Sequence, residues 1–317
     1  MSAQRPLVSI LINNYNYGRF LRDAIDSALH QTYPNTEVVV VDDGSTDDSR
    51  QIIASYGSRI IPVLKENGGQ GSAFNAGFAL CRGEWVCLLD SDDAWHPAKI
   101  EEVVGATRKF PEAVLVYHKY QSVSEELKPV DRIRPAGVFC GWIDEIIERN
   151  GGWWACPPTS AYSFRKAVLE RIGKIPEERF RICADAYLTY LVPFLGPVLG
   201  LNRCLVDYRL HGGNRFSNAA LLRKSGNADL LHKHLRRYEE LVESVNAALR
   251  RLGVPRTLDL KNHWNYQALK FKLQGADRLP FFHLVWRGLQ FSGDPALSNR
   301  LRMIVRFSLD TLRYNQV

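Results

Sequence analysis

The chain has 317 residues, of which 45% are hydrophobic and 24% charged, and this is the composition of an ordinary soluble globular protein. It has room for one large domain with an appendage or for two domains. The net charge of +7 is uneven, because residues 1–219 carry 24 Lys and Arg against 26 Asp and Glu, whereas residues 220–317 carry 17 against 8. We therefore expect a nearly neutral domain over residues 1–219 and a basic region over 220–317, whose partner would be anionic.

No segment is expected to act as a signal peptide or to span a membrane. The apolar stretch after Pro6 ends at Asn13, which is too short for either role. The longest other apolar run, Leu191–Leu201, is interrupted by prolines and a glycine. The 6 cysteines show no CxxC spacing, which favours reduced, buried thiols, and we therefore expect a cytoplasmic protein.

Short apolar segments in the first third of the chain predict strands, and each is followed by a polar loop of unusual composition. The four segments are residues 7–12, 37–41, 60–64 and 85–89. Because strands that alternate with helices form parallel sheets with right-handed crossovers, the four loops are expected on one edge of one sheet. Together they would build one pocket.

Helical spacing of apolar residues follows the first two strands, at Phe20–Leu29 and at Ile52–Tyr56. Ser45-Thr46 stands where a cap for the second of these helices is expected. Asp47-Asp48 would then lie in its first turn, where negative charge is favourable.

The fourth strand ends in three carboxylates, Asp90, Asp92 and Asp93. Three acids within four residues repel one another unless a cation lies among them, and Mg²⁺ and Mn²⁺ prefer oxygen ligands. We expect such an ion to be held there for a diphosphate. A solvated acidic turn is the alternative that this segment alone leaves open.

The sequence lacks the motifs of two common classes of nucleotide-binding protein. No GxGxxG follows the first strand and no GxxxxGK[ST] occurs, which argues against a dinucleotide-binding fold and a P-loop NTPase. The loops contain carboxylates, amides, glycines and a tyrosine instead. These groups suit a base and ribose held by acids and by stacking, with phosphates neutralised by a metal.

The last hundred residues predict helices: an amphipathic helix from Leu230 to Leu252 that stops at Gly253, then Trp264–Leu273, Leu279–Phe291 and Asp294–Arg313. The excess of Lys and Arg in these helices is compatible with two kinds of contact. One is an anionic bilayer, which would make the protein peripheral on the inner face of the plasma membrane. The other is packing as a helical cap or homodimer contact. No nucleic-acid-binding motif accompanies the charge, so nucleic acid is not an expected partner.

Five motifs, in this order, resemble those of the family 2 glycosyltransferases of GT-A fold, over residues 6–217. They are Val8-Ser-Ile-Leu-Ile-Asn-Asn-Tyr-Asn, Val40-Val-Asp-Asp-Gly-Ser-Thr-Asp, Asn67-Gly-Gly, Leu89-Asp-Ser-Asp-Asp-Ala-Trp and Tyr208-Arg-Leu-His. The resemblance implies an α/β, Rossmann-like GT-A fold with a mostly parallel sheet flanked by helices, to which this chain adds an α-helical C-terminal extension. It also implies inverting transfer of a sugar from a nucleoside diphosphate sugar to a hydroxyl, with Mn²⁺ or Mg²⁺.

The same resemblance assigns roles to the acidic residues. Asp185 corresponds to the general base, although Ala184 stands where the family often has Glu. Asp90 and Asp92 correspond to the two acids of the DxD motif, of which Asp92 ligates the metal and Asp90 faces the ribose or a metal-bound water. Two roles stay open for Asp93, which assists at the metal or caps the following helix.

In the donor site, Asp42 corresponds to the acid that hydrogen-bonds the nucleobase. The resemblance places further donor contacts at Asn14, Tyr15, Asn16, Asn67, Gly68, Ser91 and Arg209. For His211, three roles are open: a neutral metal ligand, a cation facing phosphate, or an ordinary structural histidine.

Other functions stay open at this stage. A sugar nucleotidyltransferase should have a glycine-rich, arginine-bearing loop where this chain has Asn13-Asn14-Tyr15. A non-catalytic sugar-nucleotide-binding subunit of a glycan assembly complex is the other alternative. No QxxRW-like segment is present, so we expect non-processive addition. The family most often uses UDP-sugars, and we expect a glycan or lipid-linked acceptor of the cell envelope. Trp153-Trp154 is either an acceptor platform or core.

Overall fold

The structure is a computed structural model that describes residues 5–154, 156–214, 228–274 and 301. It contains two compact units, one of Met1–Trp142 and Pro157–Leu210 and one of Ile143–Cys156 and His211–Val317. Segment 143–156 therefore belongs with the C-terminal part, and the boundary at residue 219 stays a prediction. Apart from Leu301, the expected helices Leu279–Phe291 and Asp294–Arg313 lie outside the described residues.

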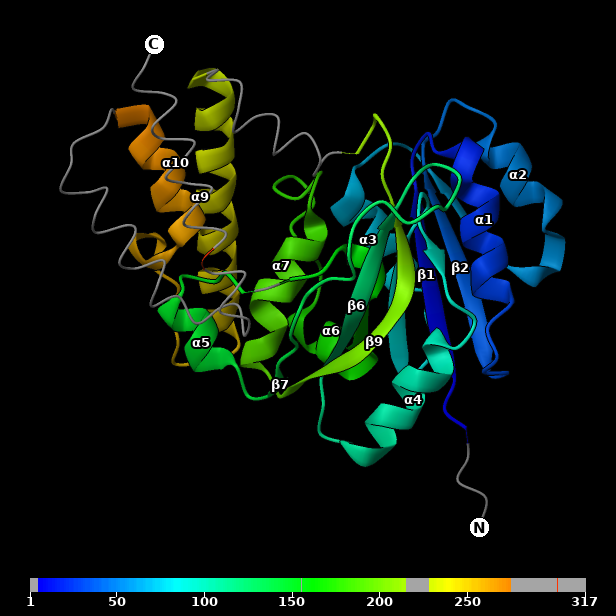
Figure 1. Ribbon diagram of the computed structural model, residues 1–317, viewed down its shortest axis with the longest axis horizontal. Coiled ribbons are helices and arrows are strands. Elements are labelled where there is room, and N and C mark those ends of the chain that lie inside the picture. The colour runs from blue at the N-terminus through cyan, green and yellow to red at the C-terminus, as the bar shows by residue number, and fades with distance from the viewer. Residues whose placement is uncertain (1–4, 155, 215–227, 275–300, 302–317) are drawn as a thin grey trace. The chain divides into compact units, whose positions relative to one another are not determined.

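The predicted strands form the first half of a sheet in the first unit (Figure 1). They are β1 (Val8–Asn14), β2 (Thr36–Asp43), β3 (Ile61–Lys65) and β4 (Trp85–Asp90). The pairs β1–β2, β1–β4 and β2–β3 are all parallel. The predicted parallel arrangement is confirmed, and the carboxyl ends of these strands share one edge.

The second half of the sheet is mixed, and the strand order is β3-β2-β1-β4-β8-β6-β9-β5. β8 (Tyr162–Arg165) runs antiparallel to β4 and to β6 (Leu115–Val123). β9 (Val198–Arg209) runs parallel to β6, so its carboxyl end returns to the edge where β4 ends. Two short strands, β5 (Ala94–Trp95) and β7 (Cys140–Gly141), pair antiparallel with β9.

Helices pack on both faces of this sheet. On one face the alternate side chains of β1 join a core with α1 (Gly18–Leu29), α2 (Ser49–Ser55) and α4 (Lys99–Lys109). α3 (Gln70–Phe78) lies on the other face, so close that a Cβ at Gly77 would be 2.3 Å from a Leu11 methyl. The remaining helical elements of the unit are α6 (Lys166–Ile172), α7 (Ala184–Leu191) and the short turns η1 (Gly57–Arg59), η2 (Thr159–Ala161) and η3 (Val192–Phe194).

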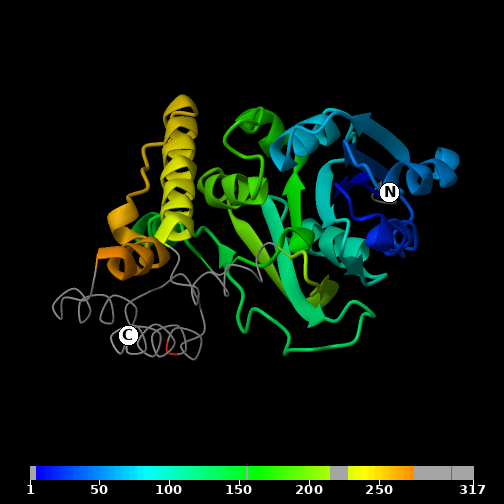
Figure 2. The same ribbon diagram turned by 90° about the horizontal axis from the view of Figure 1, so that it is seen from above.

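The second unit is helical where it is described. It contains α5 (Asp144–Arg149), α9 (Ala228–Arg251), η4 (Leu260–Asn262) and α10 (Trp264–Gln274). The two predicted helices are confirmed as α9 and α10, which lie side by side in both views (Figures 1 and 2). None of the helices in the described part of the chain is both long and apolar enough to cross a membrane.

Candidate active site

The carboxyl ends of β1, β2 and β4 bring three predicted site residues to neighbouring positions on the sheet edge. Asn14 at the end of β1 is opposite Asp42 of β2, and Asn13 is opposite Asp90 of β4. Adjacent strands are about 4.8 Å apart, so the corner at Asp42 lies two strands, or about 10 Å, from the corner at Asp90. The sequence prediction that these loops converge on one edge is confirmed.

At the β2 corner, the carboxylate of Asp42 is fully buried and accepts three hydrogen bonds. The donors are Asn14 Nδ2 at 3.0 Å, the main-chain N–H of Ser45 at 3.1 Å and Arg50 Nε at 2.9 Å. Tyr15, on the adjoining loop, is 40% exposed and offers an aromatic face to a ligand. The sequence reasoning had not singled out Arg50, whose partner lies eight positions earlier in the chain.

The expected cap of α2 is wrong. α2 begins only at Ser49, and no side chain makes a cap hydrogen bond at its N-cap residue, Asp48. Ser45 Oγ accepts instead from the main-chain N–H of Asn16 at 2.9 Å, and Asp47 accepts from the N–H of Gly18 at 2.8 Å. The polar residues of this loop therefore bind the neighbouring β1–α1 loop and fix its geometry, because that loop has main-chain donors without helical partners.

Asp43 organises the loop after β3, a role that sequence reasoning missed. Its buried carboxylate accepts from the N–H groups of Gly68 at 2.9 Å and Gly69 at 2.7 Å and from Asn67 Nδ2 at 3.1 Å. Because side chains alternate along a strand, Asp42 and Asp43 point to opposite sides and can serve different loops. Asn67 and Gly68 thus lie on the predicted edge of the sheet, and their hydrogen bonds to the Asp43 carboxylate fix the position of this loop.

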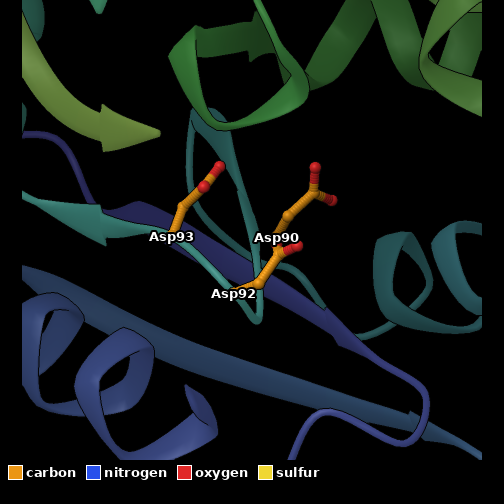
Figure 3. Close-up of side chains that lie close together, drawn as sticks. All are labelled: Asp90, Asp92 and Asp93. Carbon is orange, nitrogen blue, oxygen red and sulfur yellow. The ribbon is translucent and has the colours of Figure 1, made fainter. Parts of the chain in front are cut away.

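The three acids after β4 form one cluster on the turn that leads into β5 (Figure 3). One carboxylate oxygen from each of Asp90, Asp92 and Asp93 lies within 4.8 Å of the others. Oδ1 of Asp90 is buried and has no hydrogen-bond partner among the described groups. Burial and the charges of Asp92 and Asp185 raise the pKa of Asp90 to about 8. A buried, unpartnered carboxylate oxygen beside a second acid is a suitable donor set for a divalent cation. Ser91, between these acids, is buried.

Asp93 does not cap the following helix, and protein groups bind its carboxylate. Its carboxylate is fully buried and accepts from Ser160 Oγ at 2.5 Å and from the N–H of Arg209 at 2.9 Å. The helix that follows begins at Lys99 with Ala98 as its N-cap residue, so the capping role is wrong. Burial and the neighbouring acids raise the pKa of Asp93 well above its ordinary value. Asp93 therefore anchors the turn to η2 and β9.

Asp185 lies in the first turn of α7, close to Asp90. Thr159 lies near both carboxyl groups and lowers the pKa of each, whereas the charge of Asp185 contributes to the raised pKa of Asp90. Burial also raises the pKa of Asp185. A carboxyl group with a raised pKa beside a cation site has the properties of a general base.

The position of α7 is fixed by the start of α3. Gln70 Oε1 accepts from the N–H of Ala184 at 2.8 Å, and the N–H of Gln70 donates to the carbonyl of Arg181 at 3.0 Å. Gly69 has φ 88°, and a Cβ there would be 2.5 Å from the Cα of Arg181, so only glycine fits without a shift. The loop of Asn67 and the helix of Asp185 are consequently held together.

The two predicted basic residues differ in their surroundings. Arg209 is buried, donates through Nε to the carbonyl of Asp92 at 2.8 Å and through Nη1 to the carbonyl of Glu125, and pairs with Asp23 at 2.7 Å. It supports the acidic turn directly. His211 falls in the second unit, where its Nδ1 accepts from the N–H of Gly213 at 3.1 Å. Its role as a metal ligand stays a prediction.

Two further expectations concern the second unit and the thiols. Trp154 is fully buried, so it belongs to the core and the acceptor-platform role is wrong for it. The prediction of buried thiols holds for Cys81 and Cys87, whereas Cys140 and Cys156 are exposed.

A sequence model of the family described as Glycosyl transferase family 2 matches residues 9–173, just over half of the chain. The chain belongs to this family. An uncharacterized glycosyltransferase of Nostoc sp. is 36% identical over 269 residues, which cover 83% of this chain and 82% of that protein. The putative teichuronic acid biosynthesis glycosyltransferase TuaG of Bacillus subtilis is 28% identical over 69% of this chain and 84% of that protein. This family 2 member is therefore an enzyme of the glycosyltransferase class.

The fold of this glycosyltransferase also matches a solved structure. The crystal structure of S. aureus TarS 1–349 in complex with UDP has a TM-score of 0.55 and 19% sequence identity, and the match covers 98% of this chain and 91% of that one. Likeness at this level of identity concerns the fold alone. It confirms the predicted α/β fold of GT-A type with a helical C-terminal part.

Proposed function

We propose that this glycosyltransferase moves a sugar from a nucleoside diphosphate sugar to an acceptor hydroxyl with inversion, in a reaction that depends on Mn²⁺ or Mg²⁺. One observation carries this proposal: the carboxyl group of Asp185 lies beside the Asp90–Asp92 cluster, in which Oδ1 of Asp90 is buried without a hydrogen-bond partner among the described residues. Inverting transfer needs acids at a cation and a separate carboxylate at the acceptor, and this corner offers residues for both roles.

In the proposed reaction, Asp185 accepts the proton of the acceptor hydroxyl as that oxygen bonds to the anomeric carbon. The bond from the anomeric carbon to the phosphate oxygen breaks in the same displacement, and its electron pair leaves with the nucleoside diphosphate. Asp90 and Asp92 would hold a divalent cation, which would supply positive charge against the diphosphate. Tyr15, Asn14 and Asp42 would border the nucleoside.

UDP is the proposed nucleotide and a glycan or lipid-linked molecule the proposed acceptor. The solved TarS complex contains UDP, and TuaG is named for teichuronic acid biosynthesis, which supports a cell-envelope glycan. We further propose that the basic region, residues 220–317, contacts anionic membranes or a second copy of the chain. Salt-sensitive sedimentation with anionic liposomes would support the membrane, and a doubled mass in light scattering the dimer.

The test is a donor screen with purified protein. UDP-, GDP- and dTDP-sugars are incubated with Mn²⁺ or with EDTA, and release of nucleoside diphosphate is measured with and without glycan acceptors. We expect one donor class to react only with the metal, and NMR of the product to show inversion at the anomeric carbon. Turnover in EDTA equal to that with Mn²⁺, or retention of configuration, would contradict the proposal.

A further inference from the structure

The first residue of α4, Lys99, is a fully buried lysine that forms no ion pair in the described part of the chain. Burial lowers its pKa to about 7, and among the described residues only Cys87 counteracts this shift. An ammonium group without a counter-charge is unfavourable in a protein interior, and also at the positive end of a helix dipole. Packing alone therefore does not explain a lysine at this position, because an apolar side chain would avoid this cost.

The amino group of Lys99 is fixed between an aromatic ring and one main-chain oxygen. Its Nζ lies 3.2 Å from the centroid of the Trp95 ring and donates to the carbonyl of Ser160 at 3.2 Å. Nε1 of Trp95 donates to the same carbonyl at 2.8 Å, so this oxygen is held by two side chains at once. A neutral amine retains N–H donors, and the contact with Ser160 therefore does not depend on the charge of Lys99.

Ser160 is also the residue that holds the acidic turn after β4. Its Oγ accepts from the N–H of Asp90 at 3.0 Å and donates to the carboxylate of Asp93 at 2.5 Å. The carbonyl and the hydroxyl belong to one residue of the short turn η2, so a shift of the carbonyl moves the hydroxyl with it. A single residue therefore connects the amino group of Lys99 to the turn that carries the proposed cation ligands.

We propose that Lys99 is a positioning residue, whose amino group holds the Ser160 carbonyl and thereby keeps Asp90 and Asp92 in the geometry that binds a divalent cation. This inference rests on the proposed function. Positioning differs from a simple effect of charge, because the two act in opposite directions. A positive charge near the site repels a cation and weakens its binding, whereas a hydrogen bond that keeps the ligands in place strengthens it.

Direct binding of Mn²⁺ distinguishes these two effects and does not require activity. The full chain is titrated with Mn²⁺ in the presence of UDP, and the electron paramagnetic resonance signal of free Mn²⁺ gives the dissociation constant. The variants are Lys99→Met, which has about the same length and no donor, Ser160→Ala, and the two combined. The control is Val103→Ala, because Val103 is an equally buried core residue one turn further along α4.

We expect Lys99→Met to raise the dissociation constant of Mn²⁺ by about ten-fold, the effect of losing one hydrogen bond from a charged donor. Val103→Ala should leave this constant within about two-fold of the wild-type value, although it lowers stability. The double variant should bind Mn²⁺ about as well as the weaker single variant, because Lys99 acts through Ser160. Methionine suits a buried site, so Lys99→Met should fold, as circular dichroism checks; Lys99→Leu is a second apolar variant with the same expected result.

Several outcomes would overturn the inference and leave the proposed function intact. If Lys99→Met binds Mn²⁺ as the wild type does, or loses no more affinity than Val103→Ala, the role of Lys99 is structural only. If Lys99→Met binds Mn²⁺ more tightly, Lys99 acts through its charge. If the two single effects multiply in the double variant, Lys99 does not act through Ser160. A wild type that binds no Mn²⁺ with UDP would contradict the proposed function itself, and the inference with it.

Discussion

At the scale of single residues, burial gives neighbouring carboxyl groups different properties. Asp90 and Asp185 lie close together, and both have raised pKa values, chiefly because their carboxyl groups are removed from water. Asp90 also has Asp92 beside it, so a cation would relieve the repulsion between them. Asp93, which is fully buried, accepts hydrogen bonds from Ser160 and Arg209. Of the three acids after β4, Asp90 and Asp92 are therefore the candidate cation ligands, and Asp93 anchors the turn.

Asp185→Asn should lower kcat by about two orders of magnitude or more, with donor binding nearly unchanged. The amide keeps the size of the side chain and its place in α7, but it cannot accept the acceptor's proton. Steady-state kinetics and calorimetric donor binding on the same sample measure the two effects. Asp131→Asn, on an exposed loop, is the control. A turnover equal to that of the wild type would remove Asp185 from the role of base.

Asp92→Ala should abolish the part of donor binding that depends on the metal. Asp92 is half-buried at the acidic turn, and its loss leaves Asp90 as the only carboxylate of the proposed ligand pair. We expect the donor dissociation constant with Mn²⁺ to rise to the value that the wild type shows in EDTA. The idea would not survive a variant whose donor affinity still increases on addition of Mn²⁺.

At the scale of elements, the turn after β4 depends on η2. Ser160 Oγ accepts from the N–H of Asp90 at 3.0 Å and donates to Asp93 at 2.5 Å. Its carbonyl accepts from Trp95 Nε1 at 2.8 Å and from Lys99 Nζ at 3.2 Å. One fully buried serine thus joins the acidic turn, β5 and the start of α4, elements that are more than sixty positions away in the chain.

Ser160→Ala should raise the Mn²⁺ concentration for half-maximal activity by about ten-fold, because loss of one buried hydrogen-bond partner costs about 1–3 kcal/mol and loosens the turn. kcat at saturating Mn²⁺ should fall less. The matched control is Ser163→Ala, since Ser163 is equally buried on β8 and its hydroxyl has no hydrogen-bond partner in the described part of the chain. Equal metal titration curves for the two variants would contradict the positioning role of Ser160.

The residue just before α10, His263, is expected to make the stability of the protein depend on pH. It is fully buried beside the ring of Tyr238, and its Nδ1 accepts from the N–H of Tyr266 at 3.1 Å, as a cap residue would. Burial lowers its pKa from 6.5 to about 3. Between these values the unfolded chain binds a proton that the folded chain does not, so stability falls as pH falls.

His263→Asn should remove this dependence, because asparagine keeps the cap acceptor and does not titrate. Below pH 6.5 the free energy of unfolding of the wild type should fall, relative to that of the variant, by up to about 1.4 kcal/mol per pH unit. Urea unfolding at pH 7.5 and 5.5 measures the difference in unfolding free energy between wild type and variant, and this difference should be smaller at the lower pH. A difference that stays constant would show that His263 is not neutral in the folded protein.

Sequence alone predicts the elements whose signal is local. β1 to β4 are short apolar runs that end in polar loops, and α9 has apolar residues at helical spacing up to Gly253, so both could be recognised within their own segments. The role of Asp93 could not, since its partners Ser160 and Arg209 lie 67 and 116 positions away. Arg50 was overlooked because a half-exposed arginine in a first helical turn resembles any surface cation.

At the scale of the whole molecule, the chain passes between its two compact units more than once. Segment 143–156 lies in sequence between two parts of the first unit but packs in the second. Within the second unit, Arg256 holds α5 by pairing with Asp144 at 2.9 Å and with Glu148 at 2.9 Å. Truncation after the catalytic unit would leave these acids without their cation. Tests of function are therefore best made on the full chain.

Because only the first unit holds the proposed donor site, ligands should stabilise it selectively. We expect calorimetric heating of the full chain to show two transitions, and UDP with Mn²⁺ at a hundred-fold excess over Kd to stabilise one of them by about 2.7 kcal/mol. The same nucleotide with EDTA should shift neither. Asp92→Ala identifies the transition, since it should lose the shift while His263→Asn keeps it. If both transitions move together with ligand, the two units unfold as one, and the assignment of donor binding to the first unit alone is wrong.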